Sequence, residues 1–271
     1  MTRAVFFLAG CVAVWATCGT AMADSSEAKA RAREHWDGPF GGTFSATAAI
    51  VSDYSFAGIS QTELEPAVQP GFGYTTRDLS EAVPISAYLW AWGSNINFFP
   101  SGPGIEVDLL GGLKLKAFDK RLNIDAGYVR YTYPGSPPAL NYDYGDFSLQ
   151  VGYDFDAVQF NVKVRYSPNS FGNSGAAWNK HVQMFAPLPF LRVNENISFK
   201  AYGTLGNQWV DRYLNYGIPS NEYWYWQIGL ITSMYGVDFT AAYTDTNISI
   251  AGCGNTGNCQ GRVILSVGKT F

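Results

Sequence analysis

The alternation of apolar and polar residues over the last ten positions is the feature that most constrains how this chain folds. In a strand, Val263, Leu265, Val267 and Phe271 share one face, and Ile264, Ser266, Gly268 and Thr270 share the other. A chain that stops on an aromatic residue after such a strand is typical of a bacterial outer-membrane barrel. Its closing strand pairs with the first strand, because hydrocarbon cannot solvate an open sheet edge. These ten residues alone fit an edge strand of a soluble sandwich equally well.

The same period-2 alternation recurs along the chain and favours the barrel. It predicts twelve strands, at residues 44–50, 68–74, 85–93, 105–116, 122–128, 146–153, 158–166, 180–190, 197–205, 224–230, 237–243 and 262–271. Connections of about six residues or fewer alternate with connections of about ten to fifteen, as in barrels with short periplasmic turns and long outer loops. We therefore expect an all-β, transmembrane, antiparallel up-and-down β-barrel. The strand at 180–190 is the weakest prediction, because Pro187 and Pro189 cannot donate to a ladder.

Composition agrees with this class. Aromatic residues make up 16% of the chain and charged residues only 15%, against roughly 25% charged in soluble proteins. Mean hydropathy is near zero, and no apolar run of spanning length follows residue 23, which argues against transmembrane helices. In a barrel whose strands alternate lipid-facing and water-facing residues, the two sets offset each other and the mean hydropathy is near zero.

The N-terminal segment predicts export. Residues 1–23 resemble a cleaved signal peptide, with Arg3, an apolar stretch from Ala4 to Ala16, and the small residues Ala21 and Ala23 at the cleavage site. A lipoprotein box ending at Cys11 is the alternative. Residues 24–41 form a periplasmic lead-in, either flexible or a short helix capped by a serine, and residues 42–271 form the barrel. Seventeen basic and 22 acidic residues then remain, and this balance gives no support for nucleic-acid binding.

Two cysteines remain after the signal peptide, Cys253 and Cys259, in a Gly/Asn-rich stretch. In an exported protein such a pair predicts a disulfide, here within an outer loop. A metal site would need more ligands, and His35 and His181 are the only histidines. We expect no metal and no cofactor.

Tight turns predict which side chains face the interior. Centring two hairpins on residues 119–120 and 156–157 places Lys114 opposite Asp125 and Gln150 opposite Lys163. The ten side chains expected in the lumen are Glu106, Asp108, Lys114, Lys116, Asp125, Asp146, Gln150, Lys163, Arg165 and Lys200. Two interpretations stay open: charge-paired packing, or a narrow channel with an acidic outer vestibule and a basic waist formed by Lys114, Lys163, Arg165 and Lys200.

Enzymatic activity is not expected. An outer-membrane hydrolase needs a hydroxyl or carboxylate beside a working histidine, and no nucleophile motif surrounds His181. Gly-rich phosphate loops and His/Cys metal spacings are also missing from the sequence.

One segment carries a family resemblance. Residues 53–62, with Asp53, Tyr54, Phe56, Gly58, Ile59, Ser60, Gln61 and Thr62, resemble the D-Y-x-F-x-G-I-S-Q-T motif of the TorF family, a proteobacterial group of porin-like outer-membrane proteins. Shorter segments at 92–95, 106–112, 131–135 and 266–271 are similar to later motifs of that family. The resemblance covers about residues 43–271 and implies an outer-membrane barrel without catalytic residues. It does not extend to the Cys253/Cys259 loop.

Together these features predict a porin-like channel in the outer membrane of a Gram-negative bacterium, for passive diffusion of small hydrophilic solutes. The expected partners are outer-membrane lipid and the barrel-assembly machinery, which would engage the strand ending at Phe271. The alternatives are a closed structural or adhesive barrel, whose sign would be an occluded lumen, and an outer-membrane hydrolase.

Overall fold

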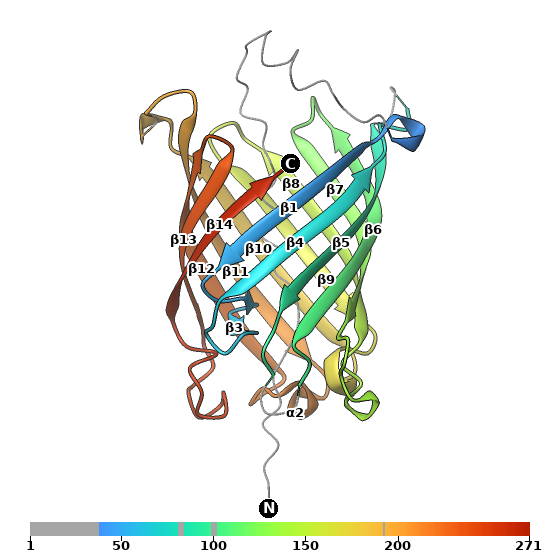
Figure 1. The fold of residues 1–271 in the computed structure, drawn as a ribbon, viewed down its shortest axis with the longest axis vertical. Coiled ribbons are helices and arrows are strands. Elements are labelled where there is room, and N and C mark those ends of the chain that lie inside the picture. Colours follow the sequence, from blue (N-terminus) through green and yellow to red (C-terminus); the bar gives the residue numbers. More distant parts are fainter. Residues whose placement is uncertain (1–37, 81–83, 99–101, 192) are drawn as a thin grey trace, which may run out of the picture.

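The computed structural model describes residues 38–80, 84–98, 102–191 and 193–271. Over these residues twelve antiparallel strands close a barrel, in which β1 pairs with both β14 and β4 (Figure 1). The fold predicted from strand alternation is confirmed. The expected signal peptide and the expected helix of the lead-in lie outside the described residues.

Each predicted segment overlaps one barrel strand, although the strands predicted at 122–128, 197–205 and 224–230 run four or five residues further. In chain order the barrel contains β1 (Thr43–Val51), β4 (Ala67–Thr75), β5 (Ile85–Asn95), β6 (Ile105–Ala117), β7 (Leu122–Thr132), β8 (Tyr144–Asp154), β9 (Gln159–Ser167), β10 (Ala177–Pro187), β11 (Ile197–Val210), β12 (Glu222–Met234), β13 (Val237–Thr246) and β14 (Arg262–Thr270). The short strands β2 (Ser55–Phe56) and β3 (Ile59–Ser60) form a separate hairpin.

Among the described residues, helical structure is confined to single turns. These are η1 (Pro39–Gly41), η2 (Pro138–Leu140), η3 (Phe171–Asn173), η4 (Pro189–Leu191) and α2 (Tyr213–Tyr216). Within the described part of the chain, no helix is long and apolar enough to cross a membrane.

The predicted strand at 180–190 is wrong at both of its limits. The observed strand, β10, begins at Ala177 and ends at Pro187, while Pro189 starts a 3-10 turn. Pro187 is tolerated because it is the last residue of its strand, where a missing N–H removes only a terminal ladder bond.

The two ends of the barrel differ. We call the end that carries the connections 52–66, 96–104, 133–143, 168–176, 211–221 and 247–261 the loop end, and the opposite end, with 76–84, 118–121, 155–158, 188–196 and 235–236, the turn end. The C-terminus lies at the turn end, which is uppermost in Figure 1, and α2 lies at the loop end. The predicted alternation in loop length holds only in part, because residues 76–84 and 188–196 are as long as the loop-end connections 96–104 and 168–176, at nine residues each.

Strand pairing agrees with the predicted registers. Lys114 lies opposite Asp125 and Gln150 opposite Lys163. At the closing seam β14 pairs with β1, and the backbone N–H groups of Phe271 and Ala46 each donate to the other's carbonyl, at 2.8 and 3.2 Å. The terminal strand therefore closes the barrel as its alternation predicted.

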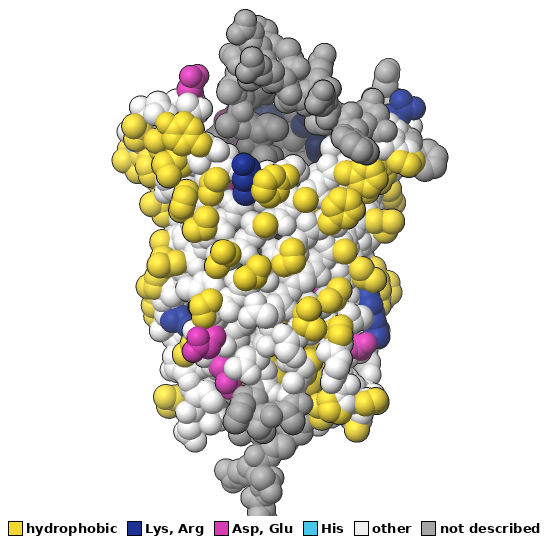
Figure 2. Space-filling view, viewed as in Figure 1, with side chains coloured by type: hydrophobic (Ala, Val, Ile, Leu, Met, Phe, Trp, Pro, Cys, Tyr) yellow, Lys and Arg dark blue, Asp and Glu magenta, His cyan; other side chains and the backbone are white. Residues whose placement is uncertain are grey.

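The outer surface of the wall is apolar. Its large exposed side chains include Ile50, Phe72, Leu89, Leu109, Leu149, Val162, Leu205, Ile228 and Leu265, with Leu89 70% exposed. Figure 2 shows such side chains spread over one face of the wall, with charged groups mainly toward its ends. Soluble monomers rarely expose so many large apolar side chains on one surface. These outward-facing side chains form an apolar belt, which suits contact with lipid.

Candidate functional site

The first connection of the loop end folds into the barrel. In it β2 and β3 pair as a hairpin, with Ser55 opposite Ser60 and Phe56 opposite Ile59. The turn residues Ala57 and Gly58 both have positive φ, at 45° and 84°, as a two-residue turn between right-twisted strands requires. A Cβ on Gly58 would lie 2.4 Å from Thr246 Cγ2, so only glycine fits where the turn meets the wall.

This segment, residues 53–62, is called the plug hairpin below. All eight residues of the motif resemblance are buried, with Tyr54 2% and Gln61 0% exposed. The sequence predicted one long outer loop between the strands at 44–50 and 68–74, and this is wrong for residues 53–62, which are buried. The misleading signal was their mixed composition, because a short polar hairpin has too few residues to show a clear period.

One carboxylate anchors the plug hairpin to the wall. Asp53 Oδ1 accepts hydrogen bonds from Ser60 Oγ at 2.5 Å and Thr62 Oγ1 at 2.9 Å. Its Oδ2 accepts from Arg262 Nε at 2.5 Å. Both side chains of the ion pair are largely buried, so charge-assisted bonds act here with little screening by water.

The same arginine ties the plug hairpin to the last loop. Arg262 Nη1 donates to the carbonyl oxygens of Gly58, Asn258 and Gln260, each at 3.1 Å. The backbone N–H of Ser60 also donates to the Asn258 carbonyl, at 2.8 Å. The start of β14 therefore holds the hairpin and the loop in one network.

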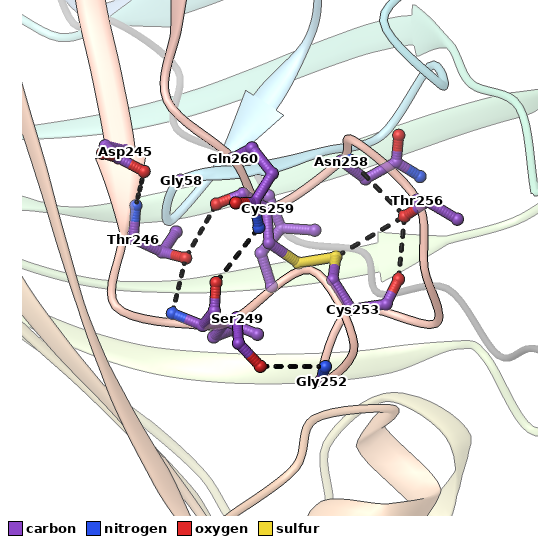
Figure 3. The surroundings of a disulfide bond; sticks show 12 residues. Gly58, Asp245, Thr246, Ser249, Gly252, Cys253, Thr256, Asn258, Cys259 and Gln260 are labelled. Atoms are coloured by element: carbon purple, nitrogen blue, oxygen red, sulfur yellow. Dashed lines mark hydrogen bonds between the residues drawn. A yellow bond between two sulfur atoms is a disulfide. The ribbon is translucent and has the colours of Figure 1, made fainter.

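The predicted disulfide is present in that loop (Figure 3). Cys253 and Cys259 are bonded, with their Cα atoms 6.0 Å apart. Thr246 Oγ1 donates to the Cys259 carbonyl at 2.9 Å. The disulfide thus constrains the backbone from which Asn258 and Gln260 accept the bonds of Arg262.

Aromatic residues fill the space around the plug hairpin. Tyr54 packs edge-on against Trp92, with ring centroids 5.5 Å apart, and the Arg165 guanidinium lies 4.6 Å from the ring centroid of Phe56. Tyr133 donates to Glu106 Oε1 at 3.0 Å, and Tyr131 accepts from Arg165 Nη1 at 3.2 Å.

Aromatic side chains of three other loop-end connections, 96–104, 133–143 and 168–176, continue this packing. Tyr142 stacks on Phe171 with centroids 4.1 Å apart, and Phe98 meets both rings edge-on. Burial raises the pKa of the Tyr142 phenol and of the Tyr216 phenol, so both stay neutral at physiological pH. The loop aromatics and the plug hairpin therefore belong to one buried cluster.

The ten predicted lumen residues divide into three groups. Glu106, Asp108, Asp146 and Arg165 are buried in the layer around the plug hairpin, whereas Lys114, Asp125, Gln150, Lys163 and Lys200 are half-buried on the inward face of their strands. Lys116 is exposed near the turn end of β6. The acidic outer vestibule stays a prediction: Glu106, Asp108 and Asp146 lie in the layer around the plug hairpin, but Arg165 lies there too.

The structure differs from the predicted basic waist in two respects. Arg165 lies in the layer around the plug hairpin, because it packs on Phe56. The sequence analysis did not place this hairpin in the lumen. Lys200 is the fourth residue of β11, near the turn end, and its ammonium lies 5.8 Å from the Phe185 ring centroid. Lys114 lies over Tyr88 at 4.7 Å, and Tyr88 donates to Asp125 at 2.9 Å.

His181 also faces the lumen. Its Nδ1 lies 3.2 Å from Asn179 Oδ1 and 3.3 Å from the Tyr225 hydroxyl, which itself donates to Asn179 at 3.1 Å. These partners are an amide and a phenol, and neither is the carboxylate that orients a catalytic histidine. The arrangement is a polar cluster in the wall rather than a hydrolytic triad.

Two spaces flank the plug hairpin. A cavity of about 80 Å³ is lined by Tyr54, Ala57 and Gly58 together with β11–β14, β1 and β4. On the other side, a space of about 10 Å³ beside Phe56, Asp146 and Arg165 has room for one water. The plug hairpin therefore contributes side chains to both spaces, Phe56 to the smaller one and Tyr54 to the larger one.

This geometry defines a class: a closed twelve-stranded antiparallel barrel with an apolar exterior, a polar interior and an inward-folded loop. Over residues 35–271 the chain matches the model of a family described as "Bacterial protein of unknown function (Gcw_chp)". The chain belongs to that family. No curated protein matches it significantly.

Among solved structures, the chain matches a porin, an outer membrane channel and a Salmonella protein, each at low sequence identity. The NanC porin shares 10% identity at a TM-score of 0.47, covering 84% of this chain and 99% of its own. An outer membrane channel from Pseudomonas putida F1 shares 8% identity at a TM-score of 0.45, covering 85% and 96%. LpxR from Salmonella typhimurium shares 10% identity at 0.41, covering 84% and 99%.

Proposed function

We propose that this protein is an outer-membrane channel for small hydrophilic solutes, with the loop end facing outward and closed by the plug hairpin. The observation that carries the proposal is a polar, charge-bearing lumen roofed by a hairpin that side-chain bonds hold in place. A barrel with a purely structural role could fill its interior with apolar side chains. The resemblance of residues 53–62 to the TorF motif supports the same function.

The apolar outer face and the polar inner face of the wall support an outer-membrane location. The apolar belt suits a lipid bilayer, and residues 1–23 would direct export before cleavage. Phe271, exposed at the turn end, fits recognition of the last strand by the barrel-assembly machinery in the periplasm.

Displacement of the plug hairpin is the step that opens the channel. The strands on either side do not need the hairpin to pair, because β1 and β4 are in register from Thr43–Thr75 to Val51–Ala67. Shortening the connection between Val51 and Ala67 would therefore remove the plug and leave the wall intact.

Planar-bilayer conductance tests the proposal with two variants. Replacement of residues 54–61 by two glycines should give a steady conductance, and Arg262→Ala should raise the open probability of the full-length barrel. Arg130→Ala is the matched control, because Arg130 is an exposed arginine on the outer surface, 3.7 Å from Asp143. Each variant must first migrate as a folded, heat-modifiable barrel.

The dense packing of the loop end favours one other function, a closed structural or adhesive barrel. The same experiment separates the two. If the folded variant without the plug hairpin shows no conductance above lipid background, the channel is refuted and the closed barrel is favoured.

A further inference from the structure

The lumen has two chemically different walls. On β6–β9 and β11 the inward side chains include Lys114, Asp125, Lys163 and Lys200. The wall beside the plug hairpin, formed by β12–β14, β1, β4 and the part of β11 that carries Tyr202 and Thr204, presents amides and hydroxyls to the cavity of about 80 Å³: Gln227, Thr240, Thr244, Ser266 and Gln69.

The described residues that line this cavity include no lysine or arginine, and Asp53 is their single charged side chain. Both carboxylate oxygens of Asp53 already accept bonds, from Ser60, Thr62 and Arg262. An anionic ligand would find no cation here, and a cationic ligand would compete with Arg262. A charged ligand would therefore lose hydration without compensation.

Two tyrosines border the cavity, and each is only 3% exposed. Tyr225 lies across Gly206 of the neighbouring strand, where a Cβ would come within 2.1 Å of its ring, and Tyr202 lies across Gly229, where the distance would be 2.5 Å. Glycine at these two positions lets each ring lie against the wall. Both tyrosines line the cavity, beside the Gln227 amide and the Thr204 hydroxyl.

We infer that this cavity binds a neutral, hydroxyl-bearing ring of the size of a monosaccharide. Amides and hydroxyls both donate and accept, as a ring with several hydroxyls requires. A cavity of about 80 Å³ has room for roughly five to eight waters at 10–15 Å³ each, which suits one sugar ring. The inference rests on the proposed function only in that the lumen must admit the solute.

Saturation-transfer NMR on the full mature barrel in LDAO micelles tests the site with three probes of one ring shape. These are methyl glucoside, which is neutral, glucuronate, which is anionic, and glucosamine, which is cationic. Methyl glucoside should receive transfer well above the other two. Equal transfer to all three would refute the site.

Two matched variants locate the binding. Gln227→Leu removes an amide from the cavity and should weaken methyl glucoside binding about three- to tenfold, the effect of one or two hydrogen bonds. Gln150→Leu makes the same change on the charged wall and should leave binding unaltered. An equal effect of both variants would overturn the assignment.

The result does not depend on conductance. A barrel that binds methyl glucoside but never conducts would refute the channel and keep the site. A barrel that conducts without distinguishing the three sugars would keep the channel and refute the site.

Discussion

Substitution of Val162 by arginine is the sharpest test of which face of the wall meets lipid. Val162 lies in the middle of β9 and is 49% exposed, between Val151 of β8 and Val182 of β10, which also point outward. An arginine near the bilayer midplane on this face should lower the free energy of unfolding by about 2–4 kcal/mol.

The neighbouring residue supplies the control. Lys163 is half-buried on the opposite face, where it pairs in register with Gln150 and His181. Lys163→Gln keeps a polar group in the lumen, so its cost should be well below that of Val162→Arg, within the roughly 0–1 kcal/mol of a partly solvated charge interaction.

Urea titration of both variants in lipid vesicles, followed by tryptophan fluorescence, measures the two free energies. Their difference is the quantity of interest, because effects common to any change in β9 cancel. Equal losses for the two variants would refute the assignment of faces and with it the alternation argument for the whole barrel.

Three further predictions follow from the outer network and the lumen charges. Thiol labelling of protein purified without reductant should find no reactive cysteine, and two labelled thiols would contradict the Cys253–Cys259 bond. Removing that bond with a double serine variant should lower the free energy of unfolding by at most about 2–3 kcal/mol, because the loop is short, yet raise the conductance because the loop holds the plug hairpin. Reversal potentials of the variant without the hairpin should show slight anion selectivity that weakens with salt and falls on Lys163→Glu. Unchanged selectivity in that variant would mean that Lys163 does not face the conducting path.

Much of the barrel could be predicted from the sequence because its determinants are local. Alternation assigns each residue to one of two faces, and short turns at residues 119–120 and 156–157 fix the register of their strands. Once one hairpin is in register, a slip in the next would move apolar side chains into the lumen. The pairing of Lys114 with Asp125 follows from this arithmetic alone.

Strand alternation predicted which charged side chains face the lumen, but not how far along the barrel axis each one lies. Strand alternation places Arg165 inside the barrel without indicating what it meets there. It meets Phe56, a residue 109 positions earlier in a different connection. Such a contact is set by where a loop folds back, and no periodicity in either segment encodes it.

The sequence by itself determined the closed wall, its two faces, the disulfide and the unequal ends. Only the tertiary structure decided that residues 53–62 enter the lumen. Asp53 and Arg262 are far apart in the chain and meet because β1 and β14, its first and last barrel strands, become neighbours when the barrel closes. Closure brings the two charges together at the loop end, and the bonds that Asp53 makes to Ser60 and Thr62 then hold the hairpin inside.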